Sequence, residues 1–213
     1  MTSRTTSNSS NAKTLLIWLG GAVVVIGLIA VVLSSGGSSG GAADHPDLQG
    51  APVVTGHALE PLAQGVQVDP EAGSPIPTVV GADFESNPVS IDNNGKAKMI
   101  IFLAHWCPNC QAEVPEVTRW LAENEVPDNV EILSVATSIT RGRDNFPPSD
   151  WLEDENWPVP VLLDSATSEV GVAYGVSLFP LWAMVGPDGN LIQRVSGAGQ
   201  VDMSFWTSTL ASL

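Results

Sequence analysis

Two cysteines, Cys107 and Cys110, are the residues of this 213-residue chain best suited to chemistry. They are the only cysteines in the sequence, and two residues separate them. A thiolate attacks a disulfide to form a mixed disulfide, and a second thiol close by can then release the partner. The spacing therefore predicts a redox-active pair in which Cys107 attacks and Cys110 resolves the intermediate.

The residues around the pair predict that both thiols lie at the start of a helix. Met99–Ala104 is an apolar run of the length of a buried strand. Pro108 suits the first helical position, where its missing N–H costs nothing, and Gln111–Glu123 continues with a helical apolar stripe. The free N–H groups and the dipole of a helix N-terminus favour a thiolate at Cys107.

Two other uses of the cysteines are weaker alternatives. An inert structural disulfide would close a loop too short to remove much chain entropy. A structural zinc site needs four ligands, and His105 is the one histidine near the two cysteines. We therefore expect no metal site, and no cofactor other than the redox-active disulfide Cys107–Cys110.

The charge of the chain restricts its partners. Eight basic residues stand against 23 acidic ones, which gives a formal net charge of −15 at pH 7. This balance argues against nucleic acid and anionic lipid surfaces as partners. A solvated acidic surface is the simplest explanation of the excess, and electrostatic steering of basic partners is the alternative.

The N-terminal part of the chain is expected to anchor it in the cell membrane. Leu15–Leu33 contains no charged residue and would span roughly 28 Å as a helix, close to the hydrocarbon thickness of about 30 Å. It is long for a cleaved signal core, which is the alternative. Arg4 and Lys13 precede it and no basic residue follows until Lys96, so residues 1–14 are expected to be cytoplasmic. The rest of the chain would then lie outside, where a disulfide can persist.

The remainder is expected to divide into a linker and one domain. Residues 34–74 begin with SSGGSSGGAA and carry scattered Pro and Gly, which predicts a flexible linker. In residues 75–213, short apolar runs alternate with helical patterns, which predicts an α/β domain with a mixed sheet covered by helices on both faces. The expected strands are Ile76–Val80, Val89–Ile91, Met99–Ala104, Val130–Ala136, Val159–Leu163, Leu181–Val185 and Leu191–Val195, and the expected helices are Gln111–Glu123, Ser149 or Asp150 to Asn156, Ser165–Tyr174 and Val201–Leu210.

The order of several motifs resembles the thioredoxin superfamily. The motifs are WCPNC at a strand-to-helix junction, Pro115 five residues after Cys110, Tyr174-Gly175-Val176, and Phe179-Pro180 ahead of a strand–Pro-Asp-Gly–strand hairpin. The anchor and the run Cys107, Cys110, Glu113, Pro115 are similar to the membrane-anchored, extracytoplasmic TlpA/ResA/DsbE-like branch. The resemblance covers about residues 74–213. It implies a thioredoxin-like fold and a thiol–disulfide oxidoreductase that acts on protein substrates.

The resemblance also implies a substrate-binding surface made of Trp106, Pro108, Phe179 and Pro180. Pro180 would match the cis-proline of the family, which faces the dithiol; an ordinary trans proline is the alternative. Its loop would expose the backbone of Phe179 to an extended substrate segment. Trp106 would shield one flank of the sulfur pair. Leu181 follows Pro180 where many relatives carry threonine, which leaves the choice of partner open.

Glu113 is the third candidate catalytic residue. It lies three residues past Cys110, on the same face of the expected helix. A partly buried carboxylate there could accept or return the proton of the resolving thiol, whereas the alternative is a solvent-facing helix glutamate. General thioredoxins carry a buried aspartate where this chain has Ile101, so Glu113 is the remaining acid.

Related functions on similar folds are less consistent with the sequence. A peroxiredoxin would carry threonine at the position of Ala104. Soft thiolates suit Cu(I), but copper-delivery relatives space their cysteines by three residues and use a distant histidine, and no histidine follows His105. Asn109 is neutral where strong oxidants carry histidine, so the thiolate is less stabilised and we expect a reductant of the cytochrome c maturation type. Such a reductant needs an electron donor in the membrane. The alternative, a disulfide-forming oxidase, would need an electron acceptor there.

Overall fold

The computed structural model describes Met1, residues 49–66 and residues 68–213. The predicted anchor, Leu15–Leu33, lies outside the described residues, as do residues 2–14 and 34–48, so these assignments remain predictions. In the part of the chain that is described, no helix is both long and apolar enough to cross a membrane.

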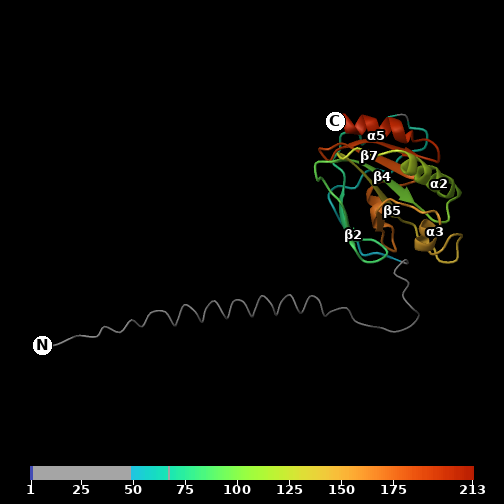
Figure 1. Cartoon of the computed structure of the whole chain (residues 1–213), viewed down its shortest axis with the longest axis horizontal. Coiled ribbons are helices and arrows are strands. Elements are labelled where there is room, and N and C mark those ends of the chain that lie inside the picture. The colour runs from blue at the N-terminus through green and yellow to red at the C-terminus, as the bar shows by residue number, and fades with distance from the viewer. Residues whose placement is uncertain (2–48, 67) are drawn as a thin grey trace. The chain divides into compact units, whose positions relative to one another are not determined.

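A five-stranded mixed sheet forms the centre of the domain, in the order β6-β5-β4-β7-β8 (Figure 1). Its strands are β4 (Ala97–Leu103), β5 (Val130–Ala136), β6 (Val161–Leu163), β7 (Leu181–Val185) and β8 (Leu191–Ser196). The β4–β5 and β5–β6 pairs are parallel, and the β4–β7 and β7–β8 pairs are antiparallel. Every residue of β4 is buried, which explains its nearly continuous apolar sequence.

Helices cover both faces of this sheet, as the sequence predicts. The helices are α2 (Pro108–Glu123), α3 (Pro148–Asp154), α4 (Glu169–Ala173) and α5 (Met203–Ala211). Successive side chains of a strand point to opposite faces, so β4 contributes to two cores. Ile101 packs in the core formed with α2, α3 and α5, whereas Ile100 and Phe102 pack in the core formed with α4. The thioredoxin-like α/β architecture with a mixed sheet is therefore confirmed.

A second sheet lies against the α4 side and was only partly predicted. Its strands are β1 (Val53–Thr55), β2 (Thr78–Ala82) and β3 (Pro88–Ile91), joined in the antiparallel order β1-β2-β3. Val79 and Ile91 of this sheet are fully buried in the second core. The sheet therefore covers part of the face that α4 leaves open.

The predicted flexible linker, residues 34–74, is wrong for its C-terminal part. Residues 53–55 form β1, and Leu59 and Leu62 are buried in the second core. Asp69 is buried in an ion pair with Arg194 of β8. The local composition resembles a linker because the partners that order this segment lie far away in the sequence.

A candidate dithiol site

Both cysteines lie where β4 leads into α2. Cys107 is the N-cap residue of α2, and Pro108 occupies its first turn. Cys107 is 9% exposed, whereas Cys110, one turn further along the helix, is completely buried. Both are free thiols in this structure. Only Cys107 is therefore placed to meet a partner from solution.

The Cys107 thiol faces the loop that precedes β7. Its Sγ donates to the Phe179 carbonyl oxygen at 3.7 Å. The Phe179–Pro180 peptide bond is cis, as the resemblance implies. A polypeptide that reaches Cys107 would thus also meet the backbone of this loop.

Cys110 lies behind Cys107 in an apolar environment. Burial raises the pKa of Cys110 far above its usual range. The backbone N–H of Ala104, 3.5 Å from the Cys110 Sγ, opposes this rise, while the charges of Cys107 and Glu113 add to it. Cys110 therefore stays protonated at neutral pH, and it must lose a proton before it can attack a mixed disulfide.

Glu113 is buried beside this thiol, so the solvent-facing alternative is wrong. Only 5% of the residue is exposed. Its Oε1 accepts a hydrogen bond from the indole Nε1 of Trp182 at 3.0 Å, and its Oε2 accepts one from the backbone N–H of Gly199 at 2.7 Å. The carboxylate is thus held by donors from β7 and from the segment that follows β8.

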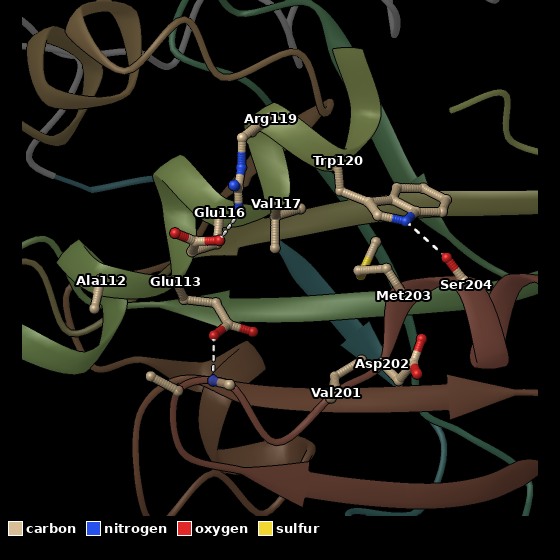
Figure 2. Close-up of a pocket in the computed structure, with 12 residues that line it drawn as sticks. Ala112, Glu113, Glu116, Val117, Arg119, Trp120, Val201, Asp202, Met203 and Ser204 are labelled. Carbon is tan, nitrogen blue, oxygen red and sulfur yellow. Dashed lines mark hydrogen bonds and ion pairs between the residues drawn. The ribbon is translucent and has the colours of Figure 1, made fainter. Parts of the chain in front are cut away.

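A cavity of about 530 Å³ lies next to Glu113, between α2 and the start of α5. Figure 2 shows the Glu113 side chain at one end of this cavity, with the indole of Trp120 and the side chain of Met203 at the other end. The Trp120 Nε1 donates to the Ser204 hydroxyl at 2.9 Å and joins the two helices. The cavity provides space for water close to an otherwise buried carboxylate.

The turn after β8 connects the two halves of the site. Gly197 donates its backbone N–H to the Pro180 carbonyl at 2.9 Å, and Gly199 donates to Glu113. Both glycines have positive φ angles, of 102° and 67°, which other residues rarely adopt. The sequence signal for this turn is the Gly-x-Gly that follows the last predicted strand, but its contacts with Pro180 and Glu113 were not foreseen.

Trp106 lies beside the cysteine turn and is half-buried. Its indole Nε1 donates to the Ser138 carbonyl at 2.8 Å, and its ring packs edge-on against Phe179 with centroids 6.1 Å apart. The guanidinium of Arg143 lies 4.8 Å from the indole centroid, within the range of a cation–π contact. Trp106 therefore joins the cysteine turn, the cis-proline loop and the 138–146 loop.

His105 is a site residue that sequence reasoning missed. The buried imidazole donates from Nδ1 to the Asp144 carbonyl at 2.7 Å and accepts at Nε2 from the Thr140 backbone N–H at 3.1 Å. Burial lowers the pKa of His105; the Asp144 carbonyl opposes this effect and the charge of Arg143 adds to it. A neutral imidazole thus ties the 138–146 loop to the cysteine turn.

The described ranges, 49–66 and 68–213, contain no group of three or more His, Cys, Asp or Glu side chains placed to hold a metal ion.

The mixed sheet, with two thiols at the start of α2 facing a cis-proline loop, defines a thioredoxin-like dithiol protein. The chain belongs to the Redoxin family, whose model matches residues 71–204. Solved structures agree with the fold: a putative thiol:disulfide interchange protein DsbE from Chlorobium tepidum has a TM-score of 0.54 at 18% identity, covering 66% of this chain and 96% of that chain. A putative thioredoxin from Neisseria meningitidis has a TM-score of 0.53 at 24% identity, covering 64% and 89%.

Curated relatives are similar over the same part of the chain. The thiol:disulfide interchange protein DsbE of Pseudomonas aeruginosa is 30% identical over 122 residues, which cover 57% of this chain and 62% of that protein. A probable nucleoredoxin 3 from rice is 28% identical over 54% of this chain, but only 24% of that protein is matched. The thiol-disulfide oxidoreductase ResA of Bacillus cereus is 25% identical over 64% of this chain and 78% of its own length. The resemblance to DsbE- and ResA-like members of the thioredoxin superfamily is therefore confirmed.

Proposed function

We propose that this protein is a thiol–disulfide oxidoreductase that exchanges disulfides with protein substrates through Cys107 and Cys110. The observation that carries the proposal is the position of the Cys107 Sγ, at the edge of the surface and 3.7 Å from the Phe179 carbonyl of the cis-proline loop. The backbone of that loop can pair with an extended partner segment while the thiol reacts. The names of the DsbE and ResA relatives support the same activity.

The reaction proceeds in two exchanges. The Cys107 thiolate attacks one sulfur of a partner disulfide, so a Cys107–partner disulfide forms, the partner S–S bond breaks, and the other partner sulfur leaves as a thiolate that takes up a proton. Cys110 then loses its proton and attacks the Cys107 sulfur. The Cys107–Cys110 disulfide forms, the mixed disulfide breaks, and two electrons have passed from the dithiol to the partner.

Glu113 is the group proposed to accept the Cys110 proton. Burial keeps the Cys110 thiol protonated, so the second exchange needs a base within the site. Glu113 lies on the same helix, is buried, and interacts electrostatically with Cys110. The cavity beside Glu113 gives the proton a path to solvent.

The direction that we propose is reduction of partner disulfides, of the cytochrome c maturation type. A pair becomes more reducing as its thiolates are less stabilised. Burial and the charges of Cys107 and Glu113 disfavour a Cys110 thiolate, and Asn109 contributes no charge to the turn. A reduction potential near that of thioredoxin, about −270 mV, supports this direction, whereas one near that of DsbA, about −120 mV, favours the oxidase alternative.

The cellular setting is part of the same proposal. Leu15–Leu33 would hold the domain outside the cell membrane, and a membrane electron donor would return the Cys107–Cys110 disulfide to the dithiol. Labelling of Cys107 by a membrane-impermeant thiol reagent in intact cells tests this location. Labelling that requires cell lysis would contradict it.

Trapping of partners tests the activity. Cys110→Ser removes the resolving thiol, so mixed disulfides with partners should accumulate on Cys107 and appear on non-reducing gels. Cys107→Ser should trap none, and the double variant is the control for adventitious disulfides. Equal trapping by the two single variants would contradict the assignment of roles.

A further inference from the structure

A second cavity, of about 470 Å³, lies beside the dithiol and is lined from three parts of the chain. Asn109 of the cysteine turn and Phe179 of the cis-proline loop line it near Cys107. Residues 193–197 of β8 and the following turn supply a second part, and residues 62–66 supply the third. We call this cavity the amide groove, because Gln64, Asn109, Gln193 and Gln200 all line it.

Residues 62–66 form a wall of the groove that is fixed to the domain. The buried Arg194 donates from Nε and Nη2 to the two carboxylate oxygens of Asp69, each at 2.8 Å. Its Nη1 donates to the Glu60 carbonyl at 2.8 Å. Glu60 precedes the wall in the sequence and Asp69 follows it. The Arg194 side chain therefore binds the chain on both sides of the wall.

The same wall is attached to the loop that faces the reactive thiol. Leu62 donates its N–H to the Gly175 carbonyl at 3.0 Å, and its own carbonyl accepts a hydrogen bond from the Ser177 hydroxyl. Arg194 also donates to the Tyr174 carbonyl at 2.9 Å. Phe179, whose carbonyl accepts from the Cys107 thiol, follows two residues after Ser177, so the wall is attached to the loop that carries this carbonyl.

The groove is electrically neutral, although the chain carries a net charge of −15. Among its described lining residues the only charged one is Arg194, and Asp69 neutralises that charge in a buried ion pair. The remaining polar ends are side-chain amides and the Ser196 hydroxyl. Amides both donate and accept hydrogen bonds, which matches peptide groups and uncharged polar side chains. A charged side chain would lose hydration there without meeting an opposite charge.

We propose that the amide groove binds the partner polypeptide on one side of its reacting cysteine, and that the wall at residues 62–66 selects partners whose flanking residues are uncharged and polar. This inference rests on the proposed thiol–disulfide exchange. It assigns the choice of partner to residues 62–66, which precede the domain predicted at residues 75–213.

Charge insertion at Gln64 tests the inference. Gln64 is exposed at the groove, so Gln64→Lys should fold; Gln49→Lys makes the same change near β6, at the opposite edge of the central sheet. The probes are synthetic peptides with one cysteine in a disulfide to 2-mercaptoethanol, flanked on either side by Gln and Ser, by Glu, or by Lys. The small disulfide 2-hydroxyethyl disulfide is the reference. The rate of oxidation of the reduced Cys107–Cys110 pair is followed by alkylation and mass spectrometry.

The wild type should react faster with the Gln/Ser peptides than with either charged set. Gln64→Lys should react about two- to fivefold faster with the Glu peptides and correspondingly slower with the Lys peptides at low salt, the range expected for one exposed charge pair. Gln49→Lys should match the wild type. All three proteins should react equally with 2-hydroxyethyl disulfide, which is too small to reach the wall.

Two failures would be distinguishable. The groove does not select partners if Gln64→Lys changes the peptide rates no more than Gln49→Lys does, or if the wild type reacts equally with all peptides. In either case, normal reaction with 2-hydroxyethyl disulfide would leave the proposed function intact. If none of the probes oxidises the reduced Cys107–Cys110 pair of the wild type, the proposed function itself fails.

Discussion

Glu113 on α2 accepts a hydrogen bond from the indole of Trp182 on β7, with 3.0 Å between Oε1 and Nε1. Trp182 is two residues past Pro180, so this bond joins the helix that carries the dithiol to the strand that follows the cis-proline loop. The second oxygen of Glu113 binds the turn at Gly199. The carboxylate therefore has a structural role in addition to its proposed role as a base.

Glu113→Gln separates these roles. If Glu113 accepts the Cys110 proton, the variant should resolve mixed disulfides more slowly, by about 10²- to 10⁴-fold for loss of a general base. If Glu113 acts only through its charge, its removal should lower the pKa of Cys110 and speed resolution. Stopped-flow measurement of the resolving step as a function of pH gives the sign, and faster resolution would contradict the proposed base.

The same substitution also predicts a loss of stability. One of the two donors, Trp182 or Gly199, would face the new amide NH₂ instead of an acceptor, which costs about 1–3 kcal/mol for an unsatisfied buried group. Denaturant unfolding of the reduced protein measures this cost. Glu116→Gln, an exposed change one turn further along α2, is the matched control and should leave the free energy of unfolding nearly unchanged.

Asp69→Asn should destabilise the domain by about 3–5 kcal/mol, because Arg194 would keep a buried charge without its partner. Burial alone would raise the pKa of Asp69, but hydrogen bonds from Arg194 and the Glu71 N–H, together with the Arg194 charge, hold it below its ordinary value of 3.8. The folded-state pKa is the lower one, so this stabilisation is present above pH 3.8 and is lost as the pH falls through the folded-state value. Unfolding curves at pH 7 and pH 3 should show a larger loss of stability in the wild type than in the variant, because Asp83 and Asp188, whose pKa values are also lowered, remain in both proteins.

His105 should make stability fall on mild acidification. Burial and the Arg143 charge lower the pKa of His105 below its ordinary value of 6.5, so the unfolded chain binds this proton more readily than the folded one. Its contribution is therefore complete above pH 6.5 and is lost as the pH falls from there through the folded-state pKa. Protonation at Nε2 would also remove the acceptor for the Thr140 N–H.

The test is urea unfolding between pH 5 and pH 8, compared with His105→Gln, which cannot titrate. The difference in free energy of unfolding between the two proteins should shrink as the pH falls. A constant difference across this range would show that His105 does not ionise on unfolding.

Gly175→Ala should be far more destabilising than Gly95→Ala. Both glycines have positive φ angles, of 64° and 81°, so alanine costs about 1–2 kcal/mol of backbone strain at either position. At Gly95 a Cβ would meet no atom within 4 Å, whereas at Gly175 it would lie 2.4 Å from both the Arg194 Nη1 and the Glu60 carbonyl oxygen. Displacing these groups should add about 1–3 kcal/mol. Equal losses in denaturant unfolding would mean that Arg194 and the Glu60 backbone adjust freely.

The parts of the fold with strong local signals were predictable. The run at Met99–Ala104 corresponds to β4, which is observed at Ala97–Leu103, and the strand predicted at Val130–Ala136 has the observed bounds of β5. Pro108 marks the first turn of α2 because its ring suits that position and few others. Length, apolar content and helix-start chemistry are all properties of neighbouring residues, so they can be read along the chain.

The features that escaped prediction depend on distant partners. Asp69 and Arg194 are 125 positions apart, and nothing in the composition around Asp69 indicates a buried acid. A buried carboxylate at Glu113 was predicted, but its hydrogen-bond donors, Trp182 and Gly199, lie 69 and 86 positions away and were not. His105 binds a loop 35 to 39 positions further on. Polar contacts of this kind follow no periodicity, so they require the fold.

The segment before residue 75 also binds the outer strand β8 and the end of β6. Ser74 and Gly73 hydrogen-bond to Leu191 at the outer side of β8, and at the other edge Gly50 donates to the Asp164 carbonyl just after β6. An uncovered edge strand presents free N–H and C=O groups that pair readily with other chains. A shortened protein that starts at residue 75 would expose this part of the β8 edge and tend to aggregate by strand pairing, whereas one that starts at residue 49 would keep these hydrogen bonds.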